Sequence, residues 1–176
     1  LAESFLDGEA GAVLNGDDLV YSSVSAVKQL CDCWETFGGT VVGVQKVSEK
    51  DISKYGSVKI AADEGNGTFF IDGIKEKPAA PEAPSLYAAL GRYVVSADFF
   101  GYLRRVPVAE NGELQFTDAL NLQAAEKGIY AKVFEGRRYD LGSKAGYLAA
   151  NVEYALRDKN LGGGFAEYLK NLSENL

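Results

Sequence analysis

GAVLNGDDLV, at residues 11–20, is an apolar run that ends in the turn-forming residues Asn, Gly and Asp. This pattern is typical of a buried strand that reaches the functional edge of a sheet. An amphipathic helix is predicted to follow over residues 22–38, and the β-branched run 40–47 predicts the next strand. Strand and helix patterns then alternate to the end of the chain. We therefore expect an α/β fold, with an open, mostly parallel sheet flanked by helices, as a single domain over residues 1–176.

Hydroxyl side chains and a turn set the boundaries of later elements. Ser96 and Thr117 each precede an apolar helical pattern and are predicted to be N-caps, the second for a helix through Lys127. A long helix is expected to begin near Ser143. The segment 57–74 predicts two strands joined by turn residues.

The composition excludes several kinds of chemistry. The 176 residues include 18 Lys and Arg against 25 Asp and Glu, a net charge of −7, and no His. Without His there is no Ser-His-Asp or Cys-His catalysis and no His-ligated zinc. The acidic balance disfavours nucleic acids and membranes as partners, because both attract clustered Lys and Arg. Catalysis must use carboxylates, Lys, Arg, backbone amides or a metal held by oxygen ligands.

Cys31 and Cys33 lie two residues apart on the first predicted helix. Their side chains would point about 200° away from each other and could not share a metal. Two reduced thiols are therefore expected, and with them a cytoplasmic protein. No apolar stretch approaches the roughly 20 residues that span a bilayer, so neither a membrane span nor a signal peptide is expected.

Acidic residues fall where an α/β sheet gathers ligands, at the carboxyl ends of strands. Asp17 follows the first predicted strand, and Asp140 ends a later one. Either carboxylate could hold Mg²⁺, which prefers carboxylate and water oxygens. A solvated turn is the simpler interpretation of NGDD alone, since these residues are the commonest turn formers. Asp140 could instead cap the helix that begins near Ser143.

The segment IKEKP, at residues 74–78, places two cations around a carboxylate. In an extended chain, Lys75 and Lys77 would lie on one side and Glu76 on the other. The lysines could then meet a phosphate and the glutamate could meet sugar hydroxyls. A surface charge run explains the segment equally well, and both interpretations stay open.

Taken in order, the motifs resemble those of bacterial UTP–glucose-1-phosphate uridylyltransferases, sugar-nucleotide pyrophosphorylases with a Rossmann-like nucleotidyltransferase α/β fold. The resemblance covers essentially the whole sequence. It rests on AVLNGDDLV (12–20), SEKDISKYGSVKI (48–60), KEKPAAPEAPS (75–85), LGRYVVSADFF (90–100), NGELQFTDAL (111–120), VFEGRRYDLGSKAGYL (133–148) and NVEYALRDKNLGGGFAEYL (151–169). The residues of the APS, GRYV, GELQ and TDA motifs within these segments favour the uridylyltransferase branch over thymidylyl- and adenylyl-transferring relatives.

The resemblance implies that UTP and glucose-1-phosphate react to give UDP-glucose and pyrophosphate. A sugar-phosphate oxygen would attack the α-phosphorus in line, with Mg²⁺ and without a covalent enzyme intermediate. Such a reaction needs positioning and charge neutralisation rather than a nucleophilic side chain, which suits a chain without His. The implied partners are the two substrates and further copies of the chain in a homo-oligomer.

The resemblance also assigns the metal-binding and catalytic residues. Asp17 and Asp140 match the two metal-binding aspartates of the family. Asp17 and Lys77 match residues that take part in catalysis, and Lys77 would bind the sugar phosphate. Many relatives read LLPDD where this chain has LNGDD. Asn15 and Gly16 are therefore expected to reshape the turn that aims Asp17.

Further substrate-binding residues follow from the same match. Glu76 corresponds to a glutamate on the glucose hydroxyls, and Gly56 to a glycine whose backbone meets the sugar. Gly91 would lie in the loop beside it. Asp118, with Thr117, belongs to a motif of the substrate site.

One segment of the family has no counterpart in these 176 residues: an N-terminal stretch with a glycine-rich GxGTR loop, a catalytic lysine and the uracil-reading residues. N-terminal strands of the fold are therefore expected to be missing. The chain alone is expected to be inactive, because each lost donor of this kind removes about 3 kcal/mol of transition-state stabilisation. Two alternatives stay open. One is a non-catalytic domain that binds a sugar phosphate or assembles with a partner, and the other is a pyrophosphorylase for another nucleotide such as dTTP.

Overall fold

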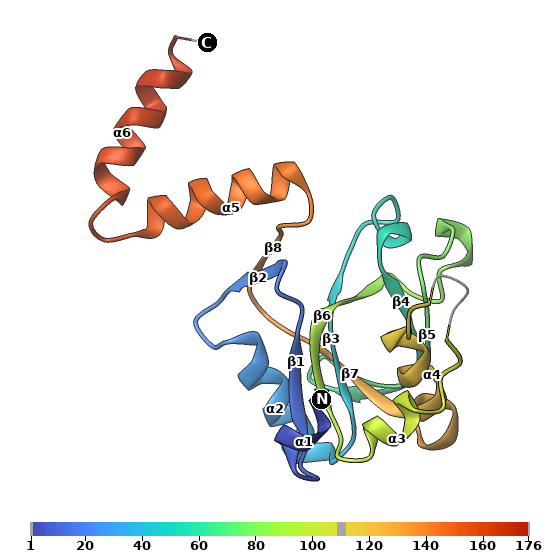
Figure 1. Ribbon diagram of the computed structural model, residues 1–176. Helices are drawn as coiled ribbons and strands as arrows, with labels where there is room; N and C mark the ends of the chain where they lie inside the picture. Colours follow the sequence, from blue (N-terminus) through green and yellow to red (C-terminus); the bar gives the residue numbers. More distant parts are fainter. Residues whose placement is uncertain (1, 109–111, 176) are drawn as a thin grey trace. The chain divides into compact units, whose positions relative to one another are not determined.

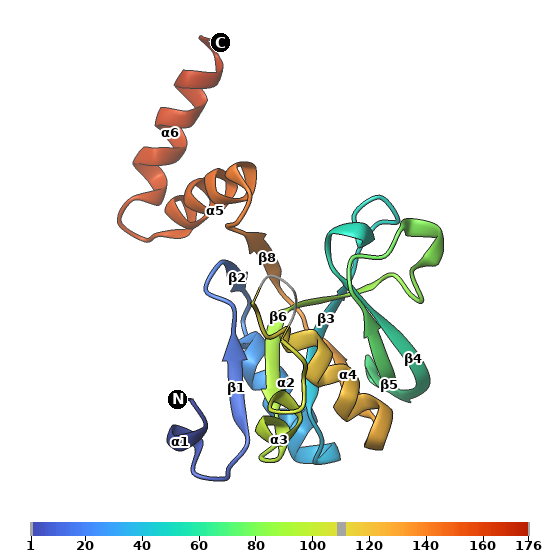
Figure 2. The same ribbon diagram turned by 45° about the vertical axis from the view of Figure 1, so that its right-hand side comes forward.

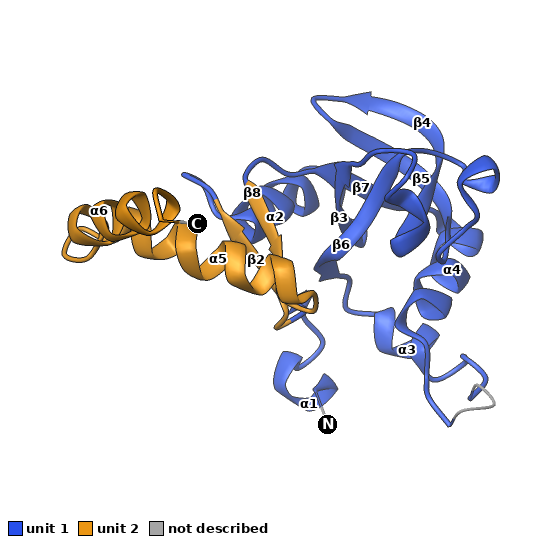
Figure 3. Cartoon of the chain, turned by 90° about the horizontal axis from the view of Figure 1, so that it is seen from above, with its two compact units in different colours: residues 1–15, 22–136 blue, residues 16–21, 137–176 orange. Residues whose placement is uncertain are grey.

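The computed structural model describes residues 2–108 and 112–175, and the chain divides into two compact units (Figure 3). Unit 1 comprises residues 1–15 and 22–136, and unit 2 comprises residues 16–21 and 137–176. Unit 2 is therefore built from two segments that are far apart in the sequence. The single domain expected over the whole chain stays a prediction.

Unit 1 is a six-stranded sheet with helices packed on it (Figure 1). The strand order is β1-β6-β3-β7-β5-β4. The strands are β1 (Gly11–Leu14), β3 (Val41–Lys46), β4 (Gly56–Gly65), β5 (Thr68–Lys75), β6 (Tyr87–Val95) and β7 (Ile129–Val133). The helices are α1 (Glu3–Leu6), α2 (Ala26–Phe37), α3 (Phe99–Leu103) and α4 (Phe116–Lys127), with short 3₁₀ helices η1 (Ile52–Lys54) and η2 (Ala80–Glu82). The expected α/β fold class is confirmed.

The sheet of unit 1 is mixed, not mostly parallel. β3 and β7 pair in parallel, and the other pairings in this sheet are antiparallel. A parallel pair needs a crossover of a dozen or more residues, which the long chain between β3 and β7 supplies. β4, β5 and β6 follow one another through connections without a long helix, so they run antiparallel. The α/β fold class holds, but the expectation of a mostly parallel sheet is wrong.

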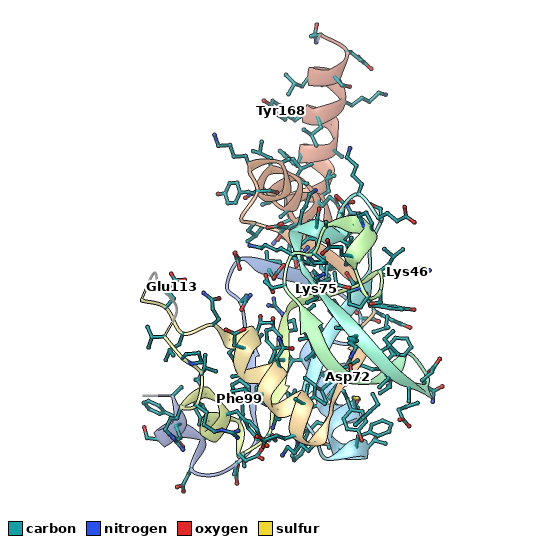
Figure 4. All side chains as sticks on the ribbon, turned by 90° about the vertical axis from the view of Figure 1, so that its right-hand side faces the viewer. Lys46, Asp72, Lys75, Phe99, Glu113 and Tyr168 are labelled. Carbon is teal, nitrogen blue, oxygen red and sulfur yellow. The ribbon has the colours of Figure 1, made fainter. Side chains whose placement is uncertain are left out.

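The helices cover both faces of this sheet, α2 on one side and α3 and α4 on the other (Figure 2). Along β3, Val42 and Val44 join a buried cluster with residues of α3 and α4, whereas Gly43 faces Leu30 of α2. Phe99, labelled in Figure 4, is 1% exposed within the cluster. The apolar surface buried on this side fixes α4 against β5.

β6 changes partners at a bulge that contains Gly91. The first part of β6 pairs with β3 and β4, where Gly56 lies opposite Ala89, and the second part pairs with β3 and β1. Between the two parts the register to β3 shifts, and Gly91 has a φ of +46°, a left-handed value that glycine tolerates best. The buried Arg92 guanidinium donates to the carbonyl oxygens of Gly91 and Asn15, both at 2.9 Å. These bonds hold the bulge in place.

Unit 2 consists of a two-stranded sheet and two helices. β2 (Asp18–Tyr21) pairs antiparallel with β8 (Arg137–Asp140), and α5 (Lys144–Arg157) and α6 (Gly162–Ser173) follow. The Arg157 guanidinium lies 4.3 Å from the centre of the Tyr21 ring and donates to the Tyr139 hydroxyl at 2.6 Å. Glu153 accepts hydrogen bonds from Tyr139 at 2.6 Å and from Arg157 at 2.8 Å. These contacts join α5 to both strands.

The run 11–20 forms two strands rather than one. β1 ends at Leu14 in unit 1, and β2 begins at Asp18 in unit 2. The turn-forming residues between them interrupt the extended chain, as their backbone preferences favour. The two strands expected over 57–74 are confirmed as β4 and β5.

Neither of the two expected helix caps is found, whereas the helix start expected near Ser143 is confirmed. The N-cap of α5 is Ser143, whose hydroxyl accepts from the N–H of Gly146 at 3.0 Å, and not Asp140, which the sequence offered as a possible cap. The predictions for Ser96 and Thr117 are wrong, because α3 begins after Asp98 and α4 begins one residue before Thr117. The Ser96 hydroxyl instead donates to the nearby Asp98 carboxylate at 2.6 Å and accepts from Gln123 of α4 at 2.7 Å, so a tertiary contact also engages the hydroxyl that local sequence assigned to a helix end.

Two expectations about thiols and membranes can be compared with the structure. Cys31 and Cys33 are free thiols on α2, as expected, and burial raises the pKa of the Cys33 thiol. Over residues 2–108 and 112–175, no helix has both the length and the apolar character needed to cross a membrane.

Candidate functional site

The segment after β5 carries Glu76 and Lys77 on a constrained backbone. β5 ends at Lys75, and Lys77 has a φ of +40°, an uncommon value for a residue with a side chain. The Lys77 N–H donates to the carbonyl oxygen of Tyr55 at 3.1 Å, and Pro78 behind it is buried. Strained backbone of this kind is concentrated at functional sites. The left-handed turn also means that the strand alternation expected for the three charged residues does not continue to Lys77.

The Glu76 carboxylate lies against Gly56. A Cβ added to Gly56 would lie 3.1 Å from Glu76 Oε2 and 2.8 Å from Ile74 Cγ2. Both distances are tighter than ordinary contacts, so Glu76 and Ile74 can keep these positions because residue 56 is glycine. Gly56 is also the cross-strand partner of Ala89, two residues before Gly91. Three residues assigned separately from the sequence are therefore gathered in one region of unit 1.

The first turn of α4 meets Glu76 from another side. The Thr117 hydroxyl donates a long hydrogen bond to Glu76 Oε2, at 3.5 Å. Asp118, the next residue, is exposed in the same turn. The structure thus places Thr117 in contact with the Glu76 carboxylate. For Asp118 it shows only that the residue follows Thr117 in the same turn.

Lys75 has a different role from Lys77. Its ammonium donates to Glu82 Oε2 at 2.7 Å, and this hydrogen bond holds the pKa of Glu82 below its usual value. Lys75 lies at the end of β5, three residues after Asp72 (Figure 4). Lys75 therefore fits the interpretation as part of a surface charge run. Lys77 is also exposed, and the phosphate-binding interpretation stays open for it.

Asp17 and Asp140 come together within unit 2. The N–H of Leu141 donates to the carbonyl oxygen of Asp17 at 2.8 Å, and the N–H of Gly142 donates to Asp140 Oδ1 at 3.0 Å. A Cβ added to Gly142 would lie 3.1 Å from Asp140 Oδ1 and 3.4 Å from Asp17 Oδ2. The two carboxylates therefore face the same small volume beside Gly142.

This pair has the chemistry that Mg²⁺ requires. Mg²⁺ binds hard oxygen ligands, commonly one or two carboxylates, and completes its shell with water and substrate phosphates. Two carboxylates facing one volume next to a glycine fit such an ion. In the part of the chain that the structure describes, no third Asp, Glu, Cys or His joins them to form a larger metal-binding cluster.

A buried ion pair beside this pair was not predicted from the sequence. Arg138 of β8 donates to the Asp18 carboxylate of β2, with side chains 14% and 9% exposed. Asp18 is also the cross-strand partner of Asp140. The ion pair therefore fixes the register that brings Asp17 near Asp140.

Asn121 of α4 is a second residue that the sequence did not single out. It lies four residues after Thr117, and its side-chain amide binds the main chain of Ile74. The four-residue spacing places the Thr117 and Asn121 side chains on one helix face. This spacing is the only feature of the local sequence that could have indicated a role for Asn121.

A cavity of about 780 Å³ lies elsewhere in unit 1. It is lined by residues of β1, α2 and the end of β6, among them Trp34, and by the segment after β6 that includes Asp98. None of the candidate site residues is among the described residues that line this cavity, so the cavity is not part of the candidate site.

A model of the nucleotidyl transferase family matches residues 1–157 of the chain. The UTP–glucose-1-phosphate uridylyltransferase 1 of Staphylococcus saprophyticus is 38% identical over 173 residues, which are 98% of this chain and 60% of that protein. A uridylyltransferase of Bacillus subtilis is 37% identical over 171 residues, 97% of this chain and 57% of its own length. The chain thus spans about three-fifths of the length of the curated relatives it matches.

Solved structures agree with these relatives. A UDP-glucose pyrophosphorylase from Acinetobacter baumannii has a TM-score of 0.88 at 29% identity, over 97% of this chain and 59% of that one. A UDP-glucose pyrophosphorylase complexed with UDP-glucose has a TM-score of 0.81 at 35% identity, over 87% and 59% of the two chains. The resemblance and the nucleotidyltransferase fold expected from the motifs are confirmed.

Proposed function

Because the chain belongs to the nucleotidyl transferase family, we propose that it forms the sugar-phosphate-binding and metal-binding part of a UTP–glucose-1-phosphate uridylyltransferase. The observation that carries the proposal is the position of Glu76, which lies against Gly56 and Thr117 and next to Lys77. A carboxylate accepts hydrogen bonds from sugar hydroxyls, and an adjacent ammonium binds a phosphate. The relatives' names supply the substrates.

Each residue of unit 1 has a role that suits its place. Glu76 accepts hydrogen bonds from glucose hydroxyls, and the exposed Lys77 ammonium neutralises the sugar phosphate. The backbone of Gly56 meets the sugar, and the Gly91 bulge shapes the neighbouring wall. Asp118 supplies a further acceptor at the start of α4.

The proposed reaction is a direct transfer. An oxygen of glucose-1-phosphate forms a bond to the α-phosphorus of UTP, and the bond from that phosphorus to the bridging β-phosphate oxygen breaks. Pyrophosphate leaves with the electron pair, and UDP-glucose remains. The side chains bind, orient and neutralise charge, and none becomes covalently attached.

In unit 2, Asp17 and Asp140 would hold Mg²⁺ through carboxylate oxygens. The ion would neutralise negative charge on the nucleotide phosphates. A homo-oligomeric assembly and a cytoplasmic location stay predictions, as does the inactivity of these 176 residues alone.

Titration calorimetry with glucose-1-phosphate tests the sugar-phosphate site. Lys77→Gln should weaken binding roughly tenfold, because a charge-assisted contact with the phosphate is lost. Lys75→Gln is the matched control, since it removes the same charge two residues away and should change the Kd less than twofold. Equal effects of the two substitutions would contradict the assignment of Lys77.

Turnover is measured beside binding, as pyrophosphate released from UTP and glucose-1-phosphate in MgCl₂. Binding without release would agree with the expected inactivity of this stretch and with a non-catalytic binding domain. Rapid release would contradict that expectation. Faster pyrophosphate release from dTTP than from UTP would favour the alternative of a pyrophosphorylase that uses dTTP.

The metal site is tested by following the Gly142 amide resonance during titration with MgCl₂. This N–H donates to Asp140, so it should shift when the carboxylate binds an ion. Asp17→Asn and Asp140→Asn should each weaken the response. Asp158→Asn is the control, because Asp158 Oδ1 accepts backbone N–H bonds in the same unit at 2.8 and 2.9 Å. A response unchanged in both test variants would refute the pair as a metal site.

A further inference from the structure

β5 loses its neighbour on one side before it ends. β7 pairs with β5 from Thr68 to Ile71, whereas β4 continues on the opposite side to Lys75. The main-chain groups of the last β5 residues that point away from β4 therefore need another partner, because unpaired N–H and C=O groups are costly when shielded from water.

The side chain of Asn121 provides this partner at Ile74. Its Oδ1 accepts from the Ile74 N–H at 2.7 Å, and its Nδ2 donates to the Ile74 carbonyl oxygen at 3.0 Å. A neighbouring strand makes the same pair of bonds to one residue of an antiparallel ladder. An amide side chain can do so because it carries a donor and an acceptor side by side. Asn121 thus takes the place of a strand where β7 has ended.

The helix that carries Asn121 is firmly anchored. Ala119 and Leu120 of α4 are fully buried in the core cluster. Thr117, one turn before Asn121, donates to Glu76. One face of α4 therefore contacts the end of β5 twice, at Ile74 and two residues later at Glu76.

Ile74 is restricted from the other side as well. A Cβ on Gly56 would lie 2.8 Å from Ile74 Cγ2, so β4 approaches Ile74 as closely as a glycine allows. Ile74 is 6% exposed. The residue that Asn121 holds is thus fixed between α4 and β4, and Glu76 and Lys77 extend directly from it.

We infer that Asn121 is a positioning residue for the sugar-phosphate site, acting through the main chain of Ile74 on Glu76 and Lys77. It does not itself touch the sugar phosphate. The ligand in this inference rests on the proposed function, whereas the control of the β5 end by Asn121 rests on geometry alone.

Two variants separate the two hydrogen bonds. Asn121→Leu keeps the approximate size, raises the helix preference and removes both bonds. Asn121→Asp keeps an acceptor for the Ile74 N–H and places a carboxylate opposite the Ile74 carbonyl. We expect amide exchange at Ile74 to accelerate roughly tenfold or more in Asn121→Leu and to stay slower in Asn121→Asp.

Binding supplies the functional readout. We expect the Kd for glucose-1-phosphate to rise about three- to tenfold in Asn121→Leu, with Asn121→Asp intermediate, because two neutral hydrogen bonds hold the site residues in place. Leu122→Ala is the control. Leu122 lies on the same helix and packs against the core, so its truncation destabilises α4 while both hydrogen bonds from Asn121 to Ile74 stay in place.

The experiment uses the whole 176-residue chain, with amide exchange, thermal unfolding and calorimetry on each variant. Weaker binding in Asn121→Leu, with unchanged affinity in the less stable Leu122→Ala, supports a positioning role. Wild-type affinity in Asn121→Leu, or equal losses in both, overturns it. If the wild-type chain does not bind glucose-1-phosphate, the proposed function fails. Exchange at Ile74 then decides whether Asn121 controls the β5 end, and unchanged exchange in Asn121→Leu overturns that claim.

Discussion

Gly56→Ala should affect stability and binding through two different neighbours. The new Cβ would lie 2.8 Å from Ile74 Cγ2 and 3.1 Å from Glu76 Oε2. Ile74 is β-branched and buried, so it cannot rotate away without strain. Glu76 is exposed and can swing aside. The contact with Ile74 should therefore lower the free energy of unfolding, and the contact with Glu76 should displace the carboxylate from its site.

The magnitude follows from this close contact. Forcing one extra carbon into a packed position costs about 1–3 kcal/mol. For a chain of this size that corresponds to a fall in Tm of roughly 2–12 °C. Urea unfolding followed by fluorescence measures the loss in unit 1, because Trp34 of α2 is the only tryptophan of the chain. Calorimetry should show glucose-1-phosphate binding weakened several-fold in the same variant.

Gly73→Ala is the matched control on β5. A Cβ there would meet Asn121 Oδ1 at 3.5 Å, an ordinary contact, so the unfolding free energy should change by less than about 0.5 kcal/mol. Adding Ile74→Leu to Gly56→Ala removes the Cγ2 branch and should recover part of the lost stability. The reasoning is refuted if Gly56→Ala is as stable as Gly73→Ala and binds with unchanged affinity.

Other predictions concern unit 2. Arg138→Met leaves Asp18 buried without its cation and should destabilise the unit by about 3–5 kcal/mol, a loss that adding Asp18→Leu partly reverses, as measured by amide exchange in β2 and β8. The hydrogen bond from Tyr139, with neighbouring guanidiniums, holds the pKa of Glu153 below its usual 4.5. The stability this contributes is complete above about pH 4.5 and is lost as the pH falls below it, so Glu153→Gln should flatten the acid limb of thermal unfolding. Gly164→Ala, where a Cβ meets no atom within 4 Å, should slow amide exchange in α6 and stabilise it by about 0.5–1 kcal/mol.

The fold class could be predicted because apolar periodicity is a local property of the chain. The split of residues 11–20 between two units could not, because turn residues mark an interruption without saying which sheet the next strand joins. Strand direction also depends on distant pairing. β6, for example, pairs with β1, β3 and β4 around the bulge at Gly91.

The candidate site shows the same division between local and distant information. A short motif predicts Glu76 and Lys77 as site residues, whereas Thr117 is expected at a helix end and in a motif of the substrate site, without its contact to Glu76. Asn121 and Arg138 were missed because their partners lie 47 and 120 residues away in the sequence. No pattern within one helix or strand reports a contact of that kind.

The discontinuous make-up of unit 2 has a consequence for synthesis on the ribosome. Arg138 is made 120 residues after Asp18, its partner in the other strand. At roughly 5–20 residues per second, β2 is synthesised about 6–24 s before β8. All strands of the unit 1 sheet have been translated by then. A released chain that ends after residue 136 should therefore hold an ordered unit 1 sheet while β2 has no strand to pair with, and Asp17 acquires its neighbour only when the last quarter of the chain is made.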